Sequence, residues 1–374
     1  IARSYGVGEE QDQLAEDKHG LIVENIGFNN EHVEKYVQHY FTGEEQEMDA
    51  KHDEEAKDHG HNRAKAFLTF LKEHPAIYGT AHVPINLQLL CKLWEKDEQA
   101  VRKVRDGSLT KLYQALVVYL WRRYQEDKER PQSAIEDEEK LYGALGRLAL
   151  HGLQTGKLII DDEERYKQVK AASKALQVSN KELQILLNYS GFLRSTEEGS
   201  GAYKKSYFLH LTFQEYFAGK ELARQLLSQD RKEAQKASTF LRTSKSGARC
   251  QIMIMLMAGA LYERVGGVES LDKLFNALGD GSEQVKDNLQ NVLLKLRCVN
   301  ECMNMEQSAQ VLDKLYKRCD SMTKQFDAWI REAIEKIRQG KAEGPELHRK
   351  LLEEFTSLAH FLERVKVADF YVKA

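Results

Sequence analysis

The chain has 374 residues, of which 30% are charged, with a formal net charge of −3 and only four prolines. This length excludes a single small domain, and the nearly balanced charge excludes the overall basic bias of many nucleic-acid-binding proteins. Few prolines and many charged residues favour a soluble, helix-rich protein. The longest apolar run, Ile252 to Leu261, falls short of the roughly 20 residues that span a bilayer.

From residue 21 to 100 the pattern predicts a first helical domain, a bundle of helices. A short strand-like run at Leu21 precedes a helix that Asn29 or Asn30 can cap. A second helix should end at His74-Pro75, because proline breaks a helix interior, and a third should start at Pro84, where proline is tolerated. The first of these helices has an apolar stripe with a period near 3.6, made by Val33, Tyr36, Val37, Tyr40 and Phe41.

A winged-helix domain is predicted over residues 101–219. Ser108 can cap its first helix, and a charged stretch around Pro131 separates that helix from the next. Two strand-like runs, 191–195 and 206–209, flank a glycine-containing turn and so predict a small β-hairpin. Between these features lie an apolar segment at 141–153, the run Leu158-Ile159-Ile160, a charged helix near 163–175 and an apolar segment at 183–187.

Beyond residue 219 almost every segment has a helical pattern, so residues 220–374 should form a second, superhelical domain of antiparallel helix pairs. No strict sequence repeat accompanies this pattern. The expected helices are 219–228, 231–243, 248–264, 268–278, 283–298, 300–317, 321–338 and 346–364.

The most specific local pattern is the string from Tyr207 to Ala223, Tyr-Phe-Leu-His-Leu-Thr-Phe-Gln-Glu-Tyr-Phe-Ala-Gly-Lys-Glu-Leu-Ala. It joins a strand-like run to a helix for which Thr212 is the candidate N-cap, and it puts His210 at the junction. A histidine among apolar residues is commonly a packed structural residue, and the surrounding aromatic residues are then simply core. The context of the string in the rest of the chain has to separate these two interpretations.

The string resembles the end of the winged-helix domain in NACHT-type signalling ATPases, the family of animal inflammasome receptors and many bacterial relatives. In that family Phe-x-His-x-Thr-Phe-Gln-Glu-Tyr/Phe-Phe-Ala is a signature. The resemblance implies that His210 contacts the β-phosphate of bound ADP.

Two further segments are similar to parts of the same family. Residues 1–6, Ile-Ala-Arg-Ser-Tyr-Gly, resemble the end of its sensor strand, although Ser4 stands where proline is usual. Residues 1–20 would then close the ATPase domain, and Arg3 would be the arginine that senses the γ-phosphate. Residues 83–91 resemble a Pro-Leu-x-Leu-x-x-Leu-Cys helix, which implies that Pro84 packs against the adenine base.

Weaker matches occur at 109–113, 148–153, 190–193, 256–261 and 298–302, so the resemblance covers residues 1 to about 305. No Gly-x-x-x-x-Gly-Lys-Ser/Thr motif occurs in the chain: the nearest string, Gly152 to Leu158, has the wrong spacing and ends in leucine. The resemblance therefore implies that ATP or ADP with Mg²⁺ is held mainly by an upstream nucleotide-binding domain. We expect this chain to be part of a longer protein, to carry no catalytic residue, and not to bind nucleotide tightly alone.

Other candidate sites are weaker. His52, His59 and His61 have no standard zinc spacing and are expected in a solvated segment, and Cys298 with Cys302 is expected in the core, so no metal ligand is assigned. Lysines before the hairpin could contact DNA, but intervening acids favour a solvated face. With five cysteines and no secretory signal, we expect reduced thiols and a cytoplasmic location.

The sequence thus predicts a fragment of an ATP/ADP-dependent signalling switch that regulates oligomerisation and effector activation, as in innate immunity. Its expected partners are the upstream nucleotide-binding domain and further copies of itself or other proteins, without nucleic acid. The alternative is a non-enzymatic, all-helical protein-interaction scaffold in which Pro84 and His210 are only structural.

Overall fold

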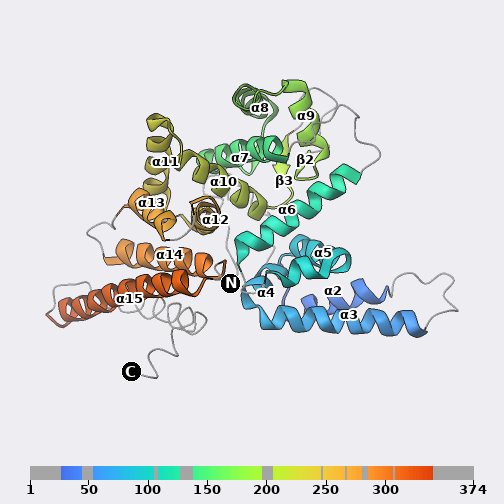
Figure 1. The fold of residues 1–374 in the computed structure, drawn as a ribbon, viewed down its shortest axis with the longest axis horizontal. Helices are drawn as coiled ribbons and strands as arrows, with labels where there is room; N and C mark the ends of the chain where they lie inside the picture. Colours follow the sequence, from blue (N-terminus) through green and yellow to red (C-terminus); the bar gives the residue numbers. More distant parts are fainter. Residues whose placement is uncertain are drawn as a thin grey trace, which may run out of the picture. The chain divides into compact units, whose positions relative to one another are not determined.

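The computed structural model describes residues 27–43, 54–104, 108–126, 138–195, 205–245, 247–265, 268–279, 285–305 and 308–339. These residues form 14 helices and a small three-stranded antiparallel sheet, which confirms the prediction of a mostly α-helical protein (Figure 1). They divide into two compact units, one within residues 1–107 and one within 108–374. Each unit is described below by itself.

The first unit contains four helices: α2 (Asn30–Thr42), α3 (Glu54–Glu73), α4 (Pro75–Ala81) and α5 (Pro84–Arg102). Of the two candidate caps for α2, Asn29 is the one used, since its side chain accepts a hydrogen bond from the backbone N–H of His32 at 2.8 Å. Proline ends α3 as expected, but it also begins the short helix α4, which the sequence pattern did not predict. Phe67, Phe70 and Trp94 pack together in the core.

The second unit begins with α6 (Leu109–Glu126) and α7 (Glu138–Thr155). Ser108 caps α6 as predicted, because its hydroxyl oxygen accepts a hydrogen bond from the backbone N–H of Lys111 at 3.1 Å. Next come β1 (Ile159–Ile160), α8 (Asp162–Leu176), α9 (Asn180–Tyr189), β2 (Leu193–Ser195) and β3 (Ser206–Phe208).

The three short strands pair in the order β1-β3-β2, all antiparallel. The β2–β3 pair is the predicted hairpin, and β1 adds a third strand in which Ile160 lies opposite Ser206. Alternate residues face opposite sides of a sheet, so Ile160 and Phe208 are buried whereas Ile159 and Tyr207 are exposed. The sheet thus has one face in the core and one outside it, where Ile159 and Arg194 flank Tyr207.

Helix α10 (Leu211–Leu226) follows β3 directly and lies at the centre of this unit, between α7 and α12 (Figure 1). Its middle approaches α12 very closely: a β-carbon added to Gly219 would lie 2.9 Å from the backbone oxygen of Met253. The remaining helices are α11 (Arg231–Ser244), α12 (Ala248–Val265), α13 (Glu269–Leu278), α14 (Val285–Met303) and α15 (Ala309–Arg338).

Two expected helix breaks are wrong. α14 continues through the position between 298 and 300, and α15 runs without interruption through 318–320, because neither site carries a glycine or proline that would stop a helix. The boundary predicted between residues 219 and 220 falls inside α10, and that division into domains stays a prediction. Arg3, the segment 1–20 and the helix expected at 346–364 lie outside the described residues.

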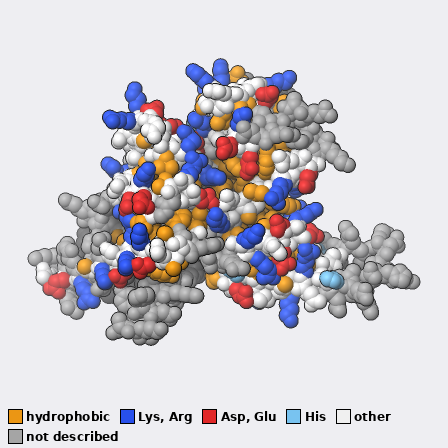
Figure 2. Space-filling view, viewed as in Figure 1, with side chains coloured by type: hydrophobic (Ala, Val, Ile, Leu, Met, Phe, Trp, Pro, Cys, Tyr) orange, Lys and Arg blue, Asp and Glu red, His pale blue; other side chains and the backbone are white. Residues whose placement is uncertain are grey.

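Among the described helices, none combines the length and the apolar character needed to cross a membrane. On the face drawn in Figure 2, Lys and Arg side chains are interspersed with Asp and Glu. This mixture agrees with the small net charge of the sequence.

Three thiols lie in the core, and we expect them to be unreactive in the native protein. Cys91, Cys298 and Cys302 are buried, and burial raises the pKa of each of these thiols because the thiolate loses its hydration. In the native state they should react with a disulfide reagent at least about 100-fold more slowly than the half-buried Cys250, because reaction requires local unfolding. Mass spectrometry after timed labelling measures each site.

This measurement should use a Cys319→Ser background, since the side chain of Cys319 lies outside what the structure describes. In that background Cys250→Ser should remove the fast phase. Rapid native-state labelling of Cys298 would contradict its place in the core, where its sulfur lies 3.9 Å from the backbone oxygen of Ile254 on α12.

Candidate functional site

His210 connects strand β3 to helix α10 and is held by backbone hydrogen bonds on both sides. The preceding residue, Leu209, donates its N–H to the carbonyl oxygen of Phe192 at 2.8 Å. The carbonyl oxygen of His210 accepts from the N–H of Phe213 at 3.1 Å, which starts the helix. With φ −156° and ψ 154°, His210 is extended, so its side chain projects at the helix start from a fixed backbone position.

The N-cap of α10 is His210 and not Thr212, so that prediction is wrong. Thr212 lies within the first turn, and its backbone N–H donates to Nδ1 of His210 at 3.2 Å. An N-cap side chain has to accept a hydrogen bond, and serine, threonine, asparagine and aspartate usually do so. Here the unprotonated Nδ1 of His210 accepts the hydrogen bond.

This cap determines where the proton of His210 lies. Because a backbone N–H can only donate, Nδ1 must be unprotonated, and the neutral ring carries its proton on Nε2. The start of a 16-residue helix also carries a partial positive charge, which attracts anions. The arrangement therefore gives a half-buried Nε2–H donor at the anion-attracting end of a central helix.

Ten of the thirteen residues that follow His210 in the string are buried. Phe213 packs edge-on against Tyr113 of α6, with ring centroids 5.5 Å apart, and Phe217 packs against Phe192 at 5.2 Å. Packing thus accounts for the aromatic residues of the string, and His210 differs from them in using its polar atoms at the helix end. The buried residues of α10 are Phe213, Gln214, Glu215, Tyr216, Phe217, Ala218, Gly219, Glu221, Leu222 and Ala223.

A lysine in the same string is held between aromatic rings. The ammonium nitrogen of Lys220 lies 5.3 Å from the ring centroid of Tyr142 on α7 and 5.5 Å from that of Tyr216. Burial lowers the pKa of Lys220 and raises the pKa of Tyr216, because each charged form loses hydration. These contacts tie α10 to α7 and give Lys220 a structural part.

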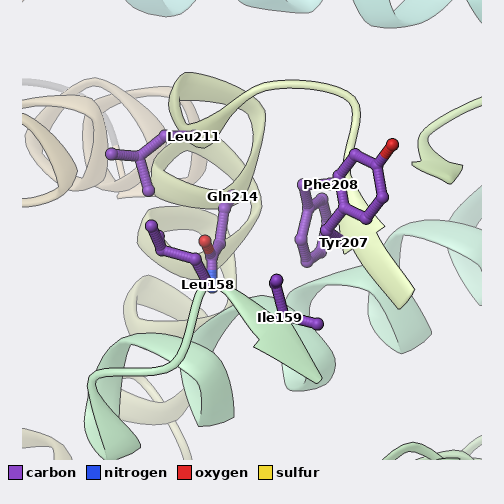
Figure 3. Close-up of a pocket in the computed structure, with 6 residues that line it drawn as sticks. All are labelled: Leu158, Ile159, Tyr207, Phe208, Leu211 and Gln214. Atoms are coloured by element: carbon purple, nitrogen blue, oxygen red, sulfur yellow. The ribbon is translucent and has the colours of Figure 1, made fainter. Parts of the chain in front are cut away.

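A pocket of about 260 Å³ lies beside the strand-to-helix junction (Figure 3). Its lining comes from β3, from α10 and from β1 with the residue before it. Three of these side chains are unusually exposed for apolar residues: Leu158 at 41%, Ile159 at 49% and Tyr207 at 39%. The hydroxyl of Tyr207 points away from the pocket in Figure 3. The lining residues are Leu158, Ile159, Tyr207, Phe208, Leu211 and Gln214.

Pro84 is the first residue of α5. The turn before it, at His82, is hydrogen-bonded to Phe28, near the first residue that the structure describes. The N–H of Phe28 donates to the carbonyl oxygen of His82 at 2.7 Å, and Nδ1 of His82 donates to the carbonyl oxygen of Phe28 at 2.7 Å. Gly27 has φ +74°, and a β-carbon there would lie 2.5 Å from the oxygen of His82, so this approach requires glycine. Pro84 therefore starts its helix from a turn that two hydrogen bonds hold in place.

That Arg3, Pro84 and His210 contact one nucleotide stays a prediction. Pro84 and His210 fall in different units, and Arg3 lies outside the described residues. The use of Nδ1 in the cap was not predicted, although a histidine two residues before a threonine at a helix start was the available signal. No family model matches this chain, and no curated protein matches it.

Proposed function

We propose that this chain is the regulatory part of a NACHT-type ATP/ADP-dependent switch, in which His210 senses bound nucleotide. The observation that carries the proposal is the cap of α10, in which Nδ1 of His210 accepts a hydrogen bond and Nε2 holds the proton. A donor of this kind, at a helix N-terminus, suits a phosphate oxygen. The resemblance of the string 207–223 to the family signature also implies that His210 contacts a phosphate.

The order of elements supports a winged-helix domain over residues 101–219. In chain order α7, β1, α8, α9, β2 and β3 give three helices and three antiparallel strands with the sheet order β1-β3-β2. This is the arrangement that a winged helix needs. Packing of α12 on α14 and of α14 on α15 supports a stack of helices for the second, superhelical domain.

In the proposed mechanism, nucleotide links two parts of the protein. A P-loop domain preceding Ile1 would hold ADP or ATP with Mg²⁺. The metal ion would neutralise part of the negative charge of the phosphates. Pro84 would contact the base, Arg3 the γ-phosphate and His210 the β-phosphate. While the contact of His210 persists, the closed state is favoured, and its loss would release the unit of residues 108–339 and permit self-association.

The substitution His210→Asn tests this function without removing the helix cap. Asparagine is a good N-cap, so the free energy of unfolding should change by less than about 1 kcal/mol. Its short amide does not replace the Nε2–H, and loss of a hydrogen bond to a charged phosphate should weaken ADP binding by about 10- to 100-fold. Isothermal titration of the longer protein with ADP measures the loss, and light scattering measures the expected rise in self-association.

The control for this experiment is Tyr166→Ala, an exposed position on α8 that should leave ADP affinity unchanged. An ADP affinity of His210→Asn equal to that of the unmodified protein would rule out the assigned contact.

A helical scaffold remains the second candidate, and one observation favours it. Ten residues of α10 are buried, so packing alone accounts for most of the string that carries the family resemblance. On this hypothesis the longer protein would bind neither ADP nor ATP. Nucleotide titration therefore distinguishes the two candidates directly.

A further inference from the structure

The hydroxyl of Thr212 makes a contact that the helix cap alone does not require. Its Oγ1 lies 3.0 Å from Nδ1 of His210, closer than the backbone N–H of the same residue at 3.2 Å. Since the N–H already requires Nδ1 to be an acceptor, the hydroxyl must donate to it. Nδ1 thus receives two hydrogen bonds from one residue.

We propose that Thr212 is a positioning residue that fixes His210 in the tautomer and ring orientation needed to donate from Nε2. This inference rests on the proposed function for its purpose, but its physical content concerns only the imidazole. The tautomer of a histidine is set by the hydrogen bond that its other nitrogen makes. With two donors at Nδ1, both the proton on that nitrogen and a flip of the ring are disfavoured.

The side chain and the backbone of Thr212 contribute separately. The backbone N–H is placed by the helix and stays in every variant at this position, whereas the hydroxyl can be removed. The residue is half-buried in the first turn of α10, where valine would keep the β-branched shape and serine would keep the hydroxyl. These two substitutions separate the hydrogen bond from the packing of the side chain.

The test is the tautomer of His210 in the 374-residue chain, read from the ring ¹⁵N chemical shifts after labelling with [¹⁵N]histidine. His210→Asn identifies the signal. In the unmodified protein Nδ1 should be unprotonated. Thr212→Val should lower the ratio of the Nε2–H form to the Nδ1–H form by about two- to twelve-fold, the effect of one ordinary hydrogen bond. Thr212→Ser should keep the original ratio.

In the longer protein the same variants should change ADP affinity in parallel: a loss of similar size for Thr212→Val and none for Thr212→Ser. A protonated Nδ1 in the unmodified protein, or a ratio unchanged by Thr212→Val, would overturn the positioning role. The proposed function would survive that outcome as long as His210→Asn weakens ADP binding. The converse result is that Thr212→Val shifts the tautomer ratio of His210 while His210→Asn keeps full ADP affinity. That result would refute the contact between His210 and nucleotide, and with it the purpose of the positioning by Thr212.

Discussion

Replacing Glu301 with alanine should lower the free energy of unfolding by about 3 kcal/mol, because three hydrogen-bond donors would each lose their acceptor at a cost of about 1 kcal/mol or more. Glu301 belongs to α14 and is only 2% exposed, yet its carboxylate caps a helix nearly two hundred residues earlier in the chain. The substitution would leave three donors at the start of α6 without the acceptor that Glu301 supplies.

Three hydrogen bonds carry this cap. Oε1 of Glu301 accepts from the hydroxyl of Ser108 at 2.6 Å and from the N–H of Thr110 at 2.7 Å, and Oε2 accepts from the N–H of Leu109 at 3.2 Å. The first backbone N–H groups of a helix have no partner within it. Ser108 and Glu301 together supply these partners, and the carboxylate also interacts favourably with the helix dipole.

Two control variants separate the charge from the burial. Glu301→Gln keeps one acceptor oxygen in the same place and should cost about 1 to 2 kcal/mol, since hydrogen bonds to a neutral acceptor are weaker. Glu263→Gln removes the ion pair that Glu263 of α12 makes with Lys111 of α6 at 3.0 Å. Because both side chains are partly exposed, this substitution should cost at most about 1 kcal/mol. Urea unfolding followed by circular dichroism measures all three. A loss below about 1 kcal/mol for Glu301→Ala would show that the cap contributes little.

The contrast between local and distant contacts explains what the sequence could predict. Ser108 was predicted as a cap, and Asn29 as one of two candidate caps, because each bonds to a residue three positions ahead, within reach of a sequence pattern. The cap by Glu301 spans 193 residues to Ser108, and nothing in the local sequence indicates it. The same distinction applies to the sheet, where the β2–β3 hairpin was predicted but β1 was not paired with β3.

At the candidate site the sequence located the junction but assigned the wrong cap. A threonine at a helix start is the commoner cap, and only the extended backbone of His210 shows that the helix begins one residue after it. Burial of both faces of α10 was equally hard to predict, because a helix that is apolar on one side normally lies at a surface. Glu221 and Gln214 look like surface residues in the sequence and are buried in the structure.

Replacing Gly219 with valine should lower the free energy of unfolding by about 3 kcal/mol, because no side chain fits where α10 crosses α12. A β-carbon at Gly219 would lie 2.9 Å from the oxygen of Met253 and 3.1 Å from the nitrogen of Met257. Both are backbone atoms, so relief requires the two helices to separate and not a change of rotamer. As a control, Gly247→Ala places its β-carbon 3.4 Å from one backbone oxygen, that of Ser244, and should change the stability by less than about 1 kcal/mol.

The form of the unfolding curve matters as much as its midpoint. Because α10 packs on both α7 and α12, the predicted winged helix and the helices after it share one core at this crossing. Gly219→Val should therefore move a single cooperative transition of residues 108–339 to lower urea concentration, with the amide protons of α7 and of α12 losing their protection from hydrogen exchange together. Loss of protection of α12 at a lower urea concentration than that of α7 would mean that α11–α15 fold independently of α7–α9. The proposed switch would then have to transmit the nucleotide signal across α10 without a common core, and His210 would control only the part of the chain that precedes the crossing.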